Sequence, residues 1–197
     1  MRNSLIFIIL SLTLLLQACQ EPKVTALSNN ATVIAFGDSL TAGVGATKGM
    51  DYPSQLANMS GLNVINAGVS GETTRQGAKR LPSVLAKHLP ELLILLEGGN
   101  DFLRNQSKAS TKANLAAMIE QAQSQGVTVL LVAVPQKSLF LSPSPIYAEL
   151  ADEYRLVLIE DVLSDLLSRS SQKSDAIHLN DSGYLALAKS ILEKINQ

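Results

Sequence analysis

The sequence predicts an α/β fold, a single domain in which a mostly parallel sheet lies between two layers of helices. Short apolar runs that end on glycine or proline alternate along the chain with segments of helical periodicity. The run Leu92 to Leu96 has no polar position, which is typical of a strand in a parallel sheet covered on both faces. No internal repeat breaks this alternation, so right-handed crossovers between parallel strands are expected.

The composition fits one domain of ordinary size. The chain has 197 residues, of which 46% are hydrophobic and 17% are charged, and this is enough to build a sizeable core. The formal net charge is -1 and no basic cluster stands out, which argues against a nucleic-acid partner. Two histidines and one cysteine cannot form a Cys/His zinc site, so a metal would need carboxylates alone. No cofactor is expected.

Residues 1–18 are predicted to be a signal peptide. Arg2 supplies the positive start, and the apolar stretch at 5–16 is too short to span a bilayer comfortably. A membrane-anchoring helix is therefore disfavoured. Export of the protein follows from this prediction.

The leader ends at Leu16-Gln17-Ala18-Cys19, which resembles a bacterial lipobox, although Gln17 is an imperfect residue for that motif. Cys19 is the chain's only cysteine and so has no disulfide partner within the chain, which makes a lipid anchor easier to accept. The protein would be a cell-envelope lipoprotein, and Gln20 favours the periplasmic face of the outer membrane in a Gram-negative host. The polar segment up to residue 30 reads as a tether, so residues 19–30 are assigned to the lipidated cysteine and tether and 31–197 to the domain.

The first strand is expected at the start of this domain, where an apolar run rich in β-branched residues ends on Gly37. In open α/β sheets ligands bind at the carboxyl ends of strands, so Ser39, which follows, is a candidate nucleophile. The alternative is that Asp38 and Ser39 only cap a following helix.

A helix is expected at 52–59 and a second strand at 62–67. The turn V-S-G-E-T-T after it leads into another helix, and Gly71 could let a substrate oxygen approach the free backbone N–H groups there. A simple turn glycine is the alternative. Pro82 interrupts the apolar spacing of that helix and predicts a kink or a fresh start.

The central strand at 92–96 is followed by E-G-G-N-D, so polar side chains again stand at a strand's carboxyl end. The side-chain amide of Asn100 could stabilise a developing oxyanion, because it is an uncharged donor. The alternative is a helix cap after the two glycines. Phe102 and Leu103 would lie beside Asn100 as apolar walls for a substrate.

A helix at 111–125 and a buried strand at 127–134 are expected next. The segment after them has no regular period and contains three consecutive apolar residues, Leu139, Phe140 and Leu141. Apolar residues on an irregular loop at this edge suggest a lining for an acyl group, and packing on the core is an equally good explanation.

The last part should contain a helix at 147–154, a strand at 156–159, and helices at 162–168 and 181–195. Before the final helix, Asp175 and His178 stand three residues apart, a spacing that lets a carboxylate orient an imidazole. A polar loop with a capping carboxylate is the alternative. Of the two histidines, His88 reads as a surface or capping residue, so His178 is the better base for Ser39.

Four segments together resemble the SGNH (GDSL) hydrolase family, and their order and spacing span essentially the whole domain. They are Gly37-Asp38-Ser39-Leu40, Gly71 in V-S-G-E-T, Gly98-Gly99-Asn100-Asp101 and Asp175-Ala176-Ile177-His178. Ala176 and Leu179 stand where the family often has glycine and proline, and neither departure removes a reacting group. The sequence has no G-x-S-x-G elbow, so the α/β-hydrolase fold is a poor alternative.

The resemblance implies a flavodoxin-like three-layer α/β/α fold and an activity like that of periplasmic thioesterases, arylesterases and lysophospholipases. It implies that Ser39 is the nucleophile, His178 the base and Asp175 the acid that orients it. It also implies an oxyanion hole formed by the N–H groups of Ser39 and Gly71 and the side chain of Asn100.

The leading hypothesis is a lipid-anchored serine esterase that acts on small or lipid-like acyl esters or thioesters, with short to medium aliphatic acyl groups. One alternative keeps the same residues but removes acetyl groups from carbohydrate or peptidoglycan, and the apolar residues 139–141 lean weakly away from it. Another is an envelope lipoprotein that uses the fold as a binding module. Retention of every expected catalytic residue argues against that one, and labelling by a fluorophosphonate would separate it from the two enzymes.

Overall fold

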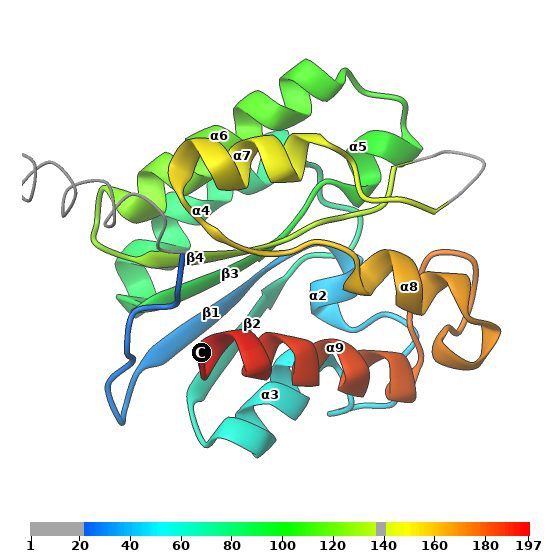
Figure 1. Cartoon of the computed structure of the whole chain (residues 1–197), viewed down its shortest axis with the longest axis horizontal. Coiled ribbons are helices and arrows are strands. Elements are labelled where there is room, and N and C mark those ends of the chain that lie inside the picture. The colour runs from blue at the N-terminus through cyan, green and yellow to red at the C-terminus, as the bar shows by residue number, and fades with distance from the viewer. Residues whose placement is uncertain (1–21, 137–140) are drawn as a thin grey trace, which may run out of the picture.

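The computed structural model describes residues 22–136 and 141–197, which form a five-stranded sheet between two layers of helices (Figure 1). All four pairs of neighbouring strands are parallel, and the order across the sheet is β2-β1-β3-β4-β5. The strands are β1 (Thr32–Gly37), β2 (Asn63–Gly68), β3 (Leu92–Leu96), β4 (Thr128–Val132) and β5 (Val157–Ile159). The predicted α/β/α fold with a parallel sheet is confirmed.

Helices cover both faces of this sheet. The longer ones are α3 (Tyr52–Ser60), α4 (Thr74–His88), α6 (Lys108–Gln123), α7 (Ile146–Tyr154) and α9 (Asp181–Ile195). Figure 1 shows α4, α6 and α7 on one face and α3 and α9 on the other. The shorter ones are α2 (Ser39–Ala42), α5 (Gly99–Leu103), α8 (Val162–Ser168) and the 3-10 turn η2 (Ser170–Gln172).

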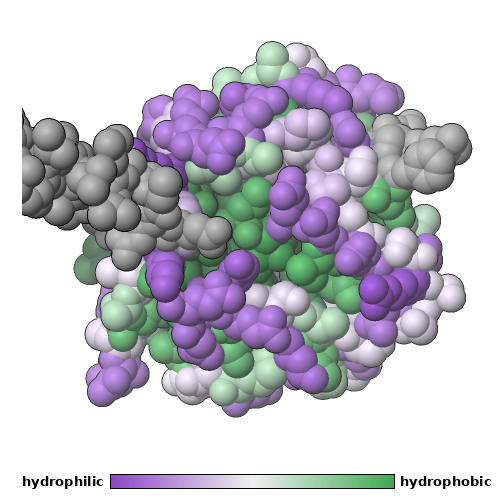
Figure 2. All heavy atoms as spheres, in the orientation of Figure 1, coloured by the Kyte–Doolittle hydropathy of each residue, from purple (hydrophilic) through white to green (hydrophobic). Residues whose placement is uncertain are grey.

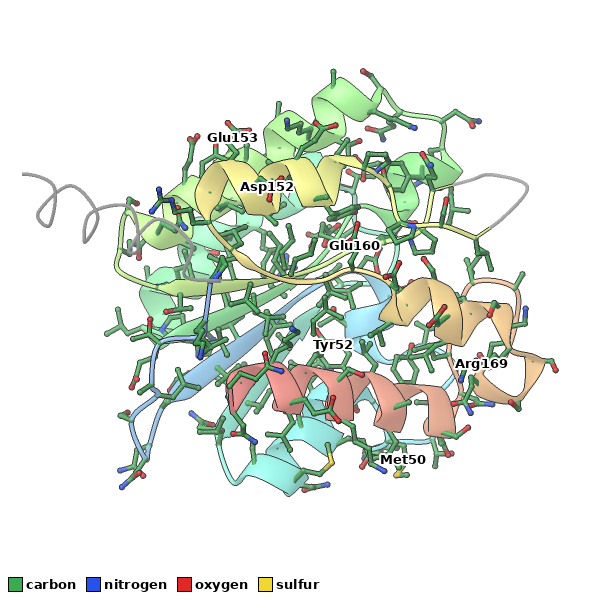
Figure 3. All side chains as sticks on the ribbon, in the orientation of Figure 1. Met50, Tyr52, Asp152, Glu153, Glu160 and Arg169 are labelled. Atoms are coloured by element: carbon green, nitrogen blue, oxygen red, sulfur yellow. The ribbon has the colours of Figure 1, made fainter. Side chains whose placement is uncertain are left out.

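The core lies on both sides of the central strands. All five residues of β3 are buried, as its uniformly apolar sequence predicts. The aromatic rings of Phe36, Tyr52 and Tyr147 are buried as well. Figure 3 shows Tyr52 between the sheet and α9, whereas Asp152 and Glu153 lie on the outer side of α7. In Figure 2 hydrophobic side chains gather in the middle of the view, between α7 and α9, where the edge strand β5 runs.

Pro82 stands inside one continuous helix, α4, so the helix does not start afresh at the proline, which was one of the two predicted outcomes. Leu81 and Leu85 on the same helix are fully buried, while Pro82 is exposed. The proline ring therefore lies on the solvent side, and the burial of the two leucines offsets the backbone hydrogen bond that proline cannot donate. The other helices and strands for which limits were predicted end within about three residues of them, which is ordinary for boundaries read from sequence. The short elements α2, α5 and η2 had no predicted limits.

The segment before β1 packs on the domain over most of its described length. Val24 is buried and Leu27 packs against the core. The Thr25 hydroxyl lies 3.2 Å from that of Thr128, at the start of β4, and the Ser28 N–H donates to the Glu91 carboxylate at 3.0 Å. Part of the predicted tether is therefore docked on the domain, because its apolar residues Val24 and Leu27 pack against the core.

Among the residues that the structure describes, no helix combines the length and the apolar character needed to cross a membrane.

Candidate active site

The carboxyl ends of the strands bring the predicted site residues to one edge of the sheet. At the end of β1, the Asp38 carboxylate accepts a hydrogen bond from the Leu40 N–H at 3.1 Å and so caps α2. Ser39 is the first residue of that helix and is partly exposed. The capping alternative thus holds for Asp38, while the Ser39 side chain stays free to face the site.

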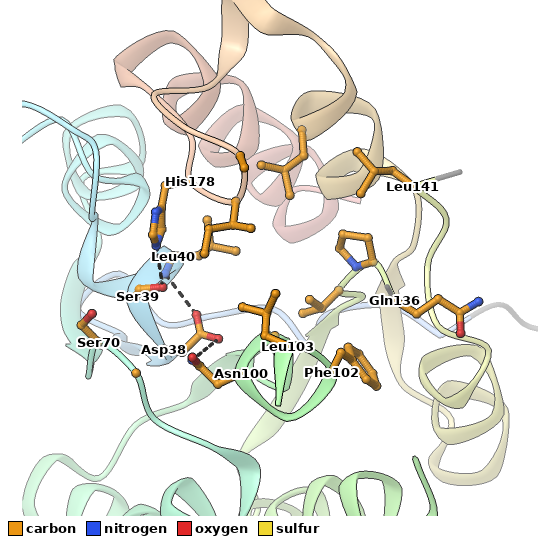
Figure 4. Close-up of a pocket in the computed structure, with 17 residues that line it drawn as sticks. Asp38, Ser39, Leu40, Ser70, Asn100, Phe102, Leu103, Gln136, Leu141 and His178 are labelled. Carbon is orange, nitrogen blue, oxygen red and sulfur yellow. Dashed lines mark hydrogen bonds between the residues drawn. The ribbon is translucent and has the colours of Figure 1, made fainter. Parts of the chain in front are cut away.

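His178 reaches Ser39 from the loop before α9. Its ring Nε2 lies 3.0 Å from the Ser39 Oγ (Figure 4), although the two residues are 139 positions apart in the chain. The turn that carries the histidine is closed by a backbone hydrogen bond from the Ser174 N–H to the His178 carbonyl, at 3.0 Å. The structure therefore places an imidazole against the serine hydroxyl.

Asp175 holds the other side of this imidazole. One carboxylate oxygen lies 2.7 Å from His178 Nδ1, and the other accepts backbone N–H groups of Ile177 at 2.8 Å and His178 at 2.9 Å. The hydrogen bond to the His178 ring, followed by the one from the Ile177 N–H, keeps the pKa of Asp175 below its usual range. An ionised Asp175 accepts a hydrogen bond from the Nδ1–H group, which keeps the proton on Nδ1 and leaves Nε2 as an acceptor for the Ser39 hydroxyl.

Gly71 and Asn100 lie in the same cavity as Ser39. The Asn100 side chain donates to the Glu72 carbonyl at 2.9 Å and, at a longer 3.3 Å, to the Asp38 carboxylate (Figure 4). Gly71 has a φ of +79°, a left-handed conformation that glycine adopts without strain. Within the described chain, the backbone N–H groups of Ser39 and Gly71 have no acceptor assigned.

Three residues in or directly after α5, namely Asn100, Asp101 and Arg104, hold the turn that carries Gly71. The Arg104 guanidinium donates to the Gly71 carbonyl at 3.0 Å. The Asp101 carboxylate accepts the Thr74 N–H at 2.9 Å and its hydroxyl at 2.6 Å. Together with Asn100, these residues connect the end of β3 to the turn after β2. Sequence reasoning quoted Asp101 as part of the G-G-N-D segment without giving it a role, and it missed Arg104, which stands four residues after Asn100.

The cavity beside Ser39 has a volume of about 370 Å³ and is lined mostly by apolar side chains (Figure 4). Of the predicted lining residues, Phe102, Leu103 and Leu141 border it, whereas Leu139 and Phe140 lie outside the described residues. The structure adds lining residues that the sequence reasoning missed, namely Leu40, Val134, Pro135, Leu167, Ala176 and Ile177. Ala176 and Ile177 stand between Asp175 and His178, a signal that could have pointed to them, whereas nothing in the sequence sets Leu167 apart from a core leucine.

Two buried carboxyl groups, Asp38 and Glu97, stand at the carboxyl ends of β1 and β3. Burial raises the pKa of Asp38 to about 6. Glu97, at the end of β3, is fully buried, and neither of its carboxylate oxygens has a hydrogen-bond partner in the described structure. Burial, with the nearby Asp38 and Glu72 carboxylates, raises the pKa of Glu97 well above its usual range. Folding thus favours the protonated form of Glu97.

We expect Glu97→Gln to stabilise the fold at pH 8 and to change little near pH 4. A carboxyl group whose pKa is higher in the folded state binds more protons there, so the free energy of unfolding falls as pH rises between the two pKa values. The loss is up to about 1.4 kcal/mol per pH unit, and each 1 kcal/mol is worth about 2–4 °C in Tm. Thermal unfolding from pH 4 to pH 8 measures the difference. Glu193→Gln, at an exposed position of α9, is the control, and equal pH slopes in wild type and Glu97→Gln would refute the prediction.

Comparison with known proteins gives a consistent result. The family model described as the GDSL-like Lipase/Acylhydrolase family matches residues 35–186. Esterase TesA of Pseudomonas aeruginosa is 34% identical over 108 residues, which cover 52% of this chain and 54%, about half, of that relative. Thioesterase 1/protease 1/lysophospholipase L1 of Escherichia coli K12 is 29% identical over 157 residues and 76% of each chain. The crystal structure of AlinE4, described as an SGNH-hydrolase family esterase, matches with a TM-score of 0.65 at 32% identity, covering 86% of this chain and 97% of that one.

Proposed function

Since the chain belongs to the GDSL-like lipase/acylhydrolase family and is an ester-hydrolysing enzyme, we propose that it is a serine esterase with a Ser39–His178–Asp175 triad. Its substrates are acyl esters or thioesters, and it works through an acyl-enzyme. The observation that carries this proposal is the pair of contacts on the two ring nitrogens of His178, 3.0 Å to Ser39 Oγ and 2.7 Å to the Asp175 carboxylate.

These contacts support a two-step reaction. His178 Nε2 takes the hydroxyl proton as Ser39 Oγ attacks the substrate carbonyl carbon, and Asp175 stabilises the imidazolium. The tetrahedral intermediate collapses when His178 returns the proton to the leaving alcohol or thiol, which leaves the acyl group on Ser39. Water, activated by the same imidazole, then releases the carboxylic acid.

Three donors stabilise the negative charge that develops on the carbonyl oxygen. They are the N–H groups of Ser39 and Gly71 and the side-chain amide of Asn100. The longer hydrogen bond of Asn100, at 3.3 Å to Asp38, is the one that an oxyanion would share or replace. Because the 2.9 Å bond to the Glu72 carbonyl persists, the amide stays aimed at the site during the reaction.

Replacing Asn100 by alanine is expected to lower kcat by about 10²- to 10³-fold with little change in KM, because this donor acts mainly on the transition state. Steady-state kinetics on a soluble ester measures the split between kcat and KM. Thermal unfolding shows whether the lost bond to Glu72 also weakens the fold. Asn63→Ala, on the exposed start of β2, is the control, and a kcat close to that of wild type in Asn100→Ala would remove this residue from the oxyanion hole.

The cavity supports an aliphatic acyl group as the part of the substrate that is bound. Leu40, Phe102 and Leu167 contribute apolar walls to the cavity that also holds Ser39, and the volume of about 370 Å³ is within the usual range of small-molecule sites. Transfer of methylene groups from water into such a cavity contributes about 0.8 kcal/mol each. Each methylene group added to the acyl chain of the substrate should therefore raise kcat/KM until the cavity is filled.

A p-nitrophenyl ester series from acetyl to palmitoyl tests the proposal. The domain should begin at Gln20 rather than later, so that the buried Val24 is kept. A Ser39-dependent optimum beyond acetyl supports the acyl esterase. Activity confined to acetyl would instead favour an O-acetyl esterase on carbohydrate or peptidoglycan, and no hydrolysis with no fluorophosphonate labelling would favour a binding lipoprotein.

We also propose that residues 1–18 are removed on export and that Cys19 carries a lipid in the bacterial cell envelope, on the periplasmic face of the outer membrane. The support is the leader pattern together with the described structure, which begins to pack on the domain at Val24, shortly after Cys19. Mass spectrometry of the amino-terminal peptide would test the lipid, and Cys19→Ser should release the protein from the membrane fraction.

A further inference from the structure

The segment that joins the domain to the proposed anchor docks at one edge of the sheet. Thr25 contacts Thr128 at the start of β4, and Ser28 contacts Glu91 just before β3. Both contacts lie at the amino ends of parallel strands, which we call the amino edge. Ser39, Asn100 and the reactive histidine lie at the carboxyl ends, the opposite edge. Figure 1 shows this separation, with the blue segment before β1 on one side and α2 and α5 on the other.

The chain between the proposed lipid and the docked segment is short. Five residue steps separate Cys19 from Val24, so they span at most about 18 Å when fully extended. Strand β1 alone, with six residues, measures about 20 Å, and loops extend beyond both of its ends. A chain of this length cannot run from Val24 back past the cavity, so a lipid on Cys19 would hold the amino edge, and not the mouth of the cavity, next to the bilayer.

Side chains at the amino edge suit contact with a bilayer surface. Leu89 lies in the connection between α4 and β3 and is 77% exposed, the highest value among the large hydrophobic side chains described. It has a φ of +45° and is followed by Pro90, so this leucine is held outward at a tight bend. Met59, at the end of α3, is also partly exposed at this edge. Each of these side chains could insert into the boundary between lipid headgroups and acyl chains, as exposed leucines do at membrane surfaces.

Basic side chains also lie at the amino edge. Lys87 is exposed in the last turn of α4, two residues from Leu89. Lys23 and Arg155 are exposed and line one groove next to the amino ends of β4 and β5. The nearby Glu91 carboxylate accepts hydrogen bonds from the backbone N–H and the hydroxyl of Ser28. Lysines and arginines near a membrane surface are attracted to anionic lipid headgroups.

We propose that the amino edge, with Lys23, Met59, Lys87, Leu89 and Arg155, lies on the bilayer that holds the Cys19 lipid, and that the catalytic cavity opens away from that bilayer. This proposal rests on the proposed anchor. Its consequence for function is that the enzyme takes esters from the aqueous phase or from a structure facing the membrane, rather than lipids of its own bilayer. The apolar rim of the cavity, Leu103, Leu141 and Ile177, then contacts the acyl group of the substrate instead of the membrane.

Fluorescent labels on single cysteines test the orientation in the lipidated full-length product reconstituted into vesicles with anionic lipid. Lipidation consumes the thiol of Cys19, the chain's only cysteine, so Leu89→Cys and Leu103→Cys each offer one labelling site. Nitroxide-bearing lipids should quench a dye at position 89 and leave a dye at position 103 unquenched. Quenching at 103 and not at 89, or quenching at neither position, would overturn the proposal.

Lengthening the tether gives an independent test. A flexible insert of 20 Gly/Ser residues after Glu21 adds a root-mean-square span of about 25 Å, which lets the domain turn. Hydrolysis of lysophosphatidylcholine in the same vesicles should rise about tenfold, because the tethered cavity then meets that substrate at high effective concentration. Hydrolysis of p-nitrophenyl butyrate in solution should not change. Lipid hydrolysis that is already as fast without the insert would contradict the proposed orientation.

The controls separate this inference from its premises. Hydrolysis of p-nitrophenyl butyrate reports the proposed activity whatever the orientation. The mass of the amino-terminal peptide reports the lipid on Cys19, and a peptide without lipid would overturn both the anchor and the orientation while leaving the esterase proposal intact.

Discussion

Ser39→Ala is expected to lower kcat/KM toward p-nitrophenyl esters by about 10⁴-fold or more, with the fold unchanged. In the proposed mechanism the Ser39 hydroxyl forms the acyl-enzyme. The neighbouring Asp38 cannot replace it, because its side chain is buried and caps α2. Steady-state kinetics, with circular dichroism as a check of folding, measures the effect.

Ser70→Ala provides a matched control for this variant. Ser70 borders the same cavity and is exposed, yet it has no histidine contact among the described hydrogen bonds (Figure 4). Its replacement should leave kcat/KM within a few-fold of wild type. Loss of activity in Ser70→Ala together with retention in Ser39→Ala would reassign the nucleophile.

His178→Ala should cause a loss of similar size, about 10⁴-fold or more in kcat, because it removes the base that takes the proton of Ser39. Asp175→Asn should be milder by about one to two orders of magnitude. The Asp175 side chain is 53% exposed and mainly orients the ring, so water and the amide can take over part of its role. Steady-state kinetics on both variants gives the ratio of their kcat values directly.

The other histidine of the chain makes a good control. His88 lies at the end of α4, at the edge of the sheet away from Ser39, so His88→Ala should keep wild-type kinetics. Equal turnover in wild type and His178→Ala, or identical pH-rate profiles for the two, would reject the assigned base.

The parts of the fold that the sequence predicts well are those in which one local signal dominates. The uniformly apolar run of β3 could only be a buried strand or a buried helix segment, and its length and flanking residues decided between them. Position made Ser39 and His178 candidates, because Ser39 follows a strand at its carboxyl end and His178 stands in a short loop beside a carboxylate. The roles of Gly71 and Asn100 were implied by the resemblance of the four segments to a family. Topology then brings such positions to one edge.

The parts that the sequence did not predict depend on contacts between distant segments. Whether Pro82 breaks α4 depends on which side of the helix faces solvent, and that is set by the sheet beneath it. The docking of Val24 depends on a site offered by the rest of the domain. The hydrogen bond from Arg104 to the Gly71 carbonyl joins two connections that follow different strands, and no local pattern encodes it.

The contact between His178 and Ser39 makes catalytic competence a property of the completed chain. The two residues are 139 positions apart. The loop after α2 is also held by residues of α9: the Tyr184 hydroxyl donates to the Val44 carbonyl at 2.8 Å, and the Asp181 carboxylate accepts a hydrogen bond from the Thr47 N–H at 2.7 Å. Such non-local contacts form late, after the entropy of closing a long loop has been overcome. On the proposed export route the amino terminus would emerge first, so Ser39 would reach the outside well before His178. An enzyme with the proposed triad would then stay inert until α9 docks. Recovery of activity during refolding should therefore track the last folding step instead of the appearance of secondary structure.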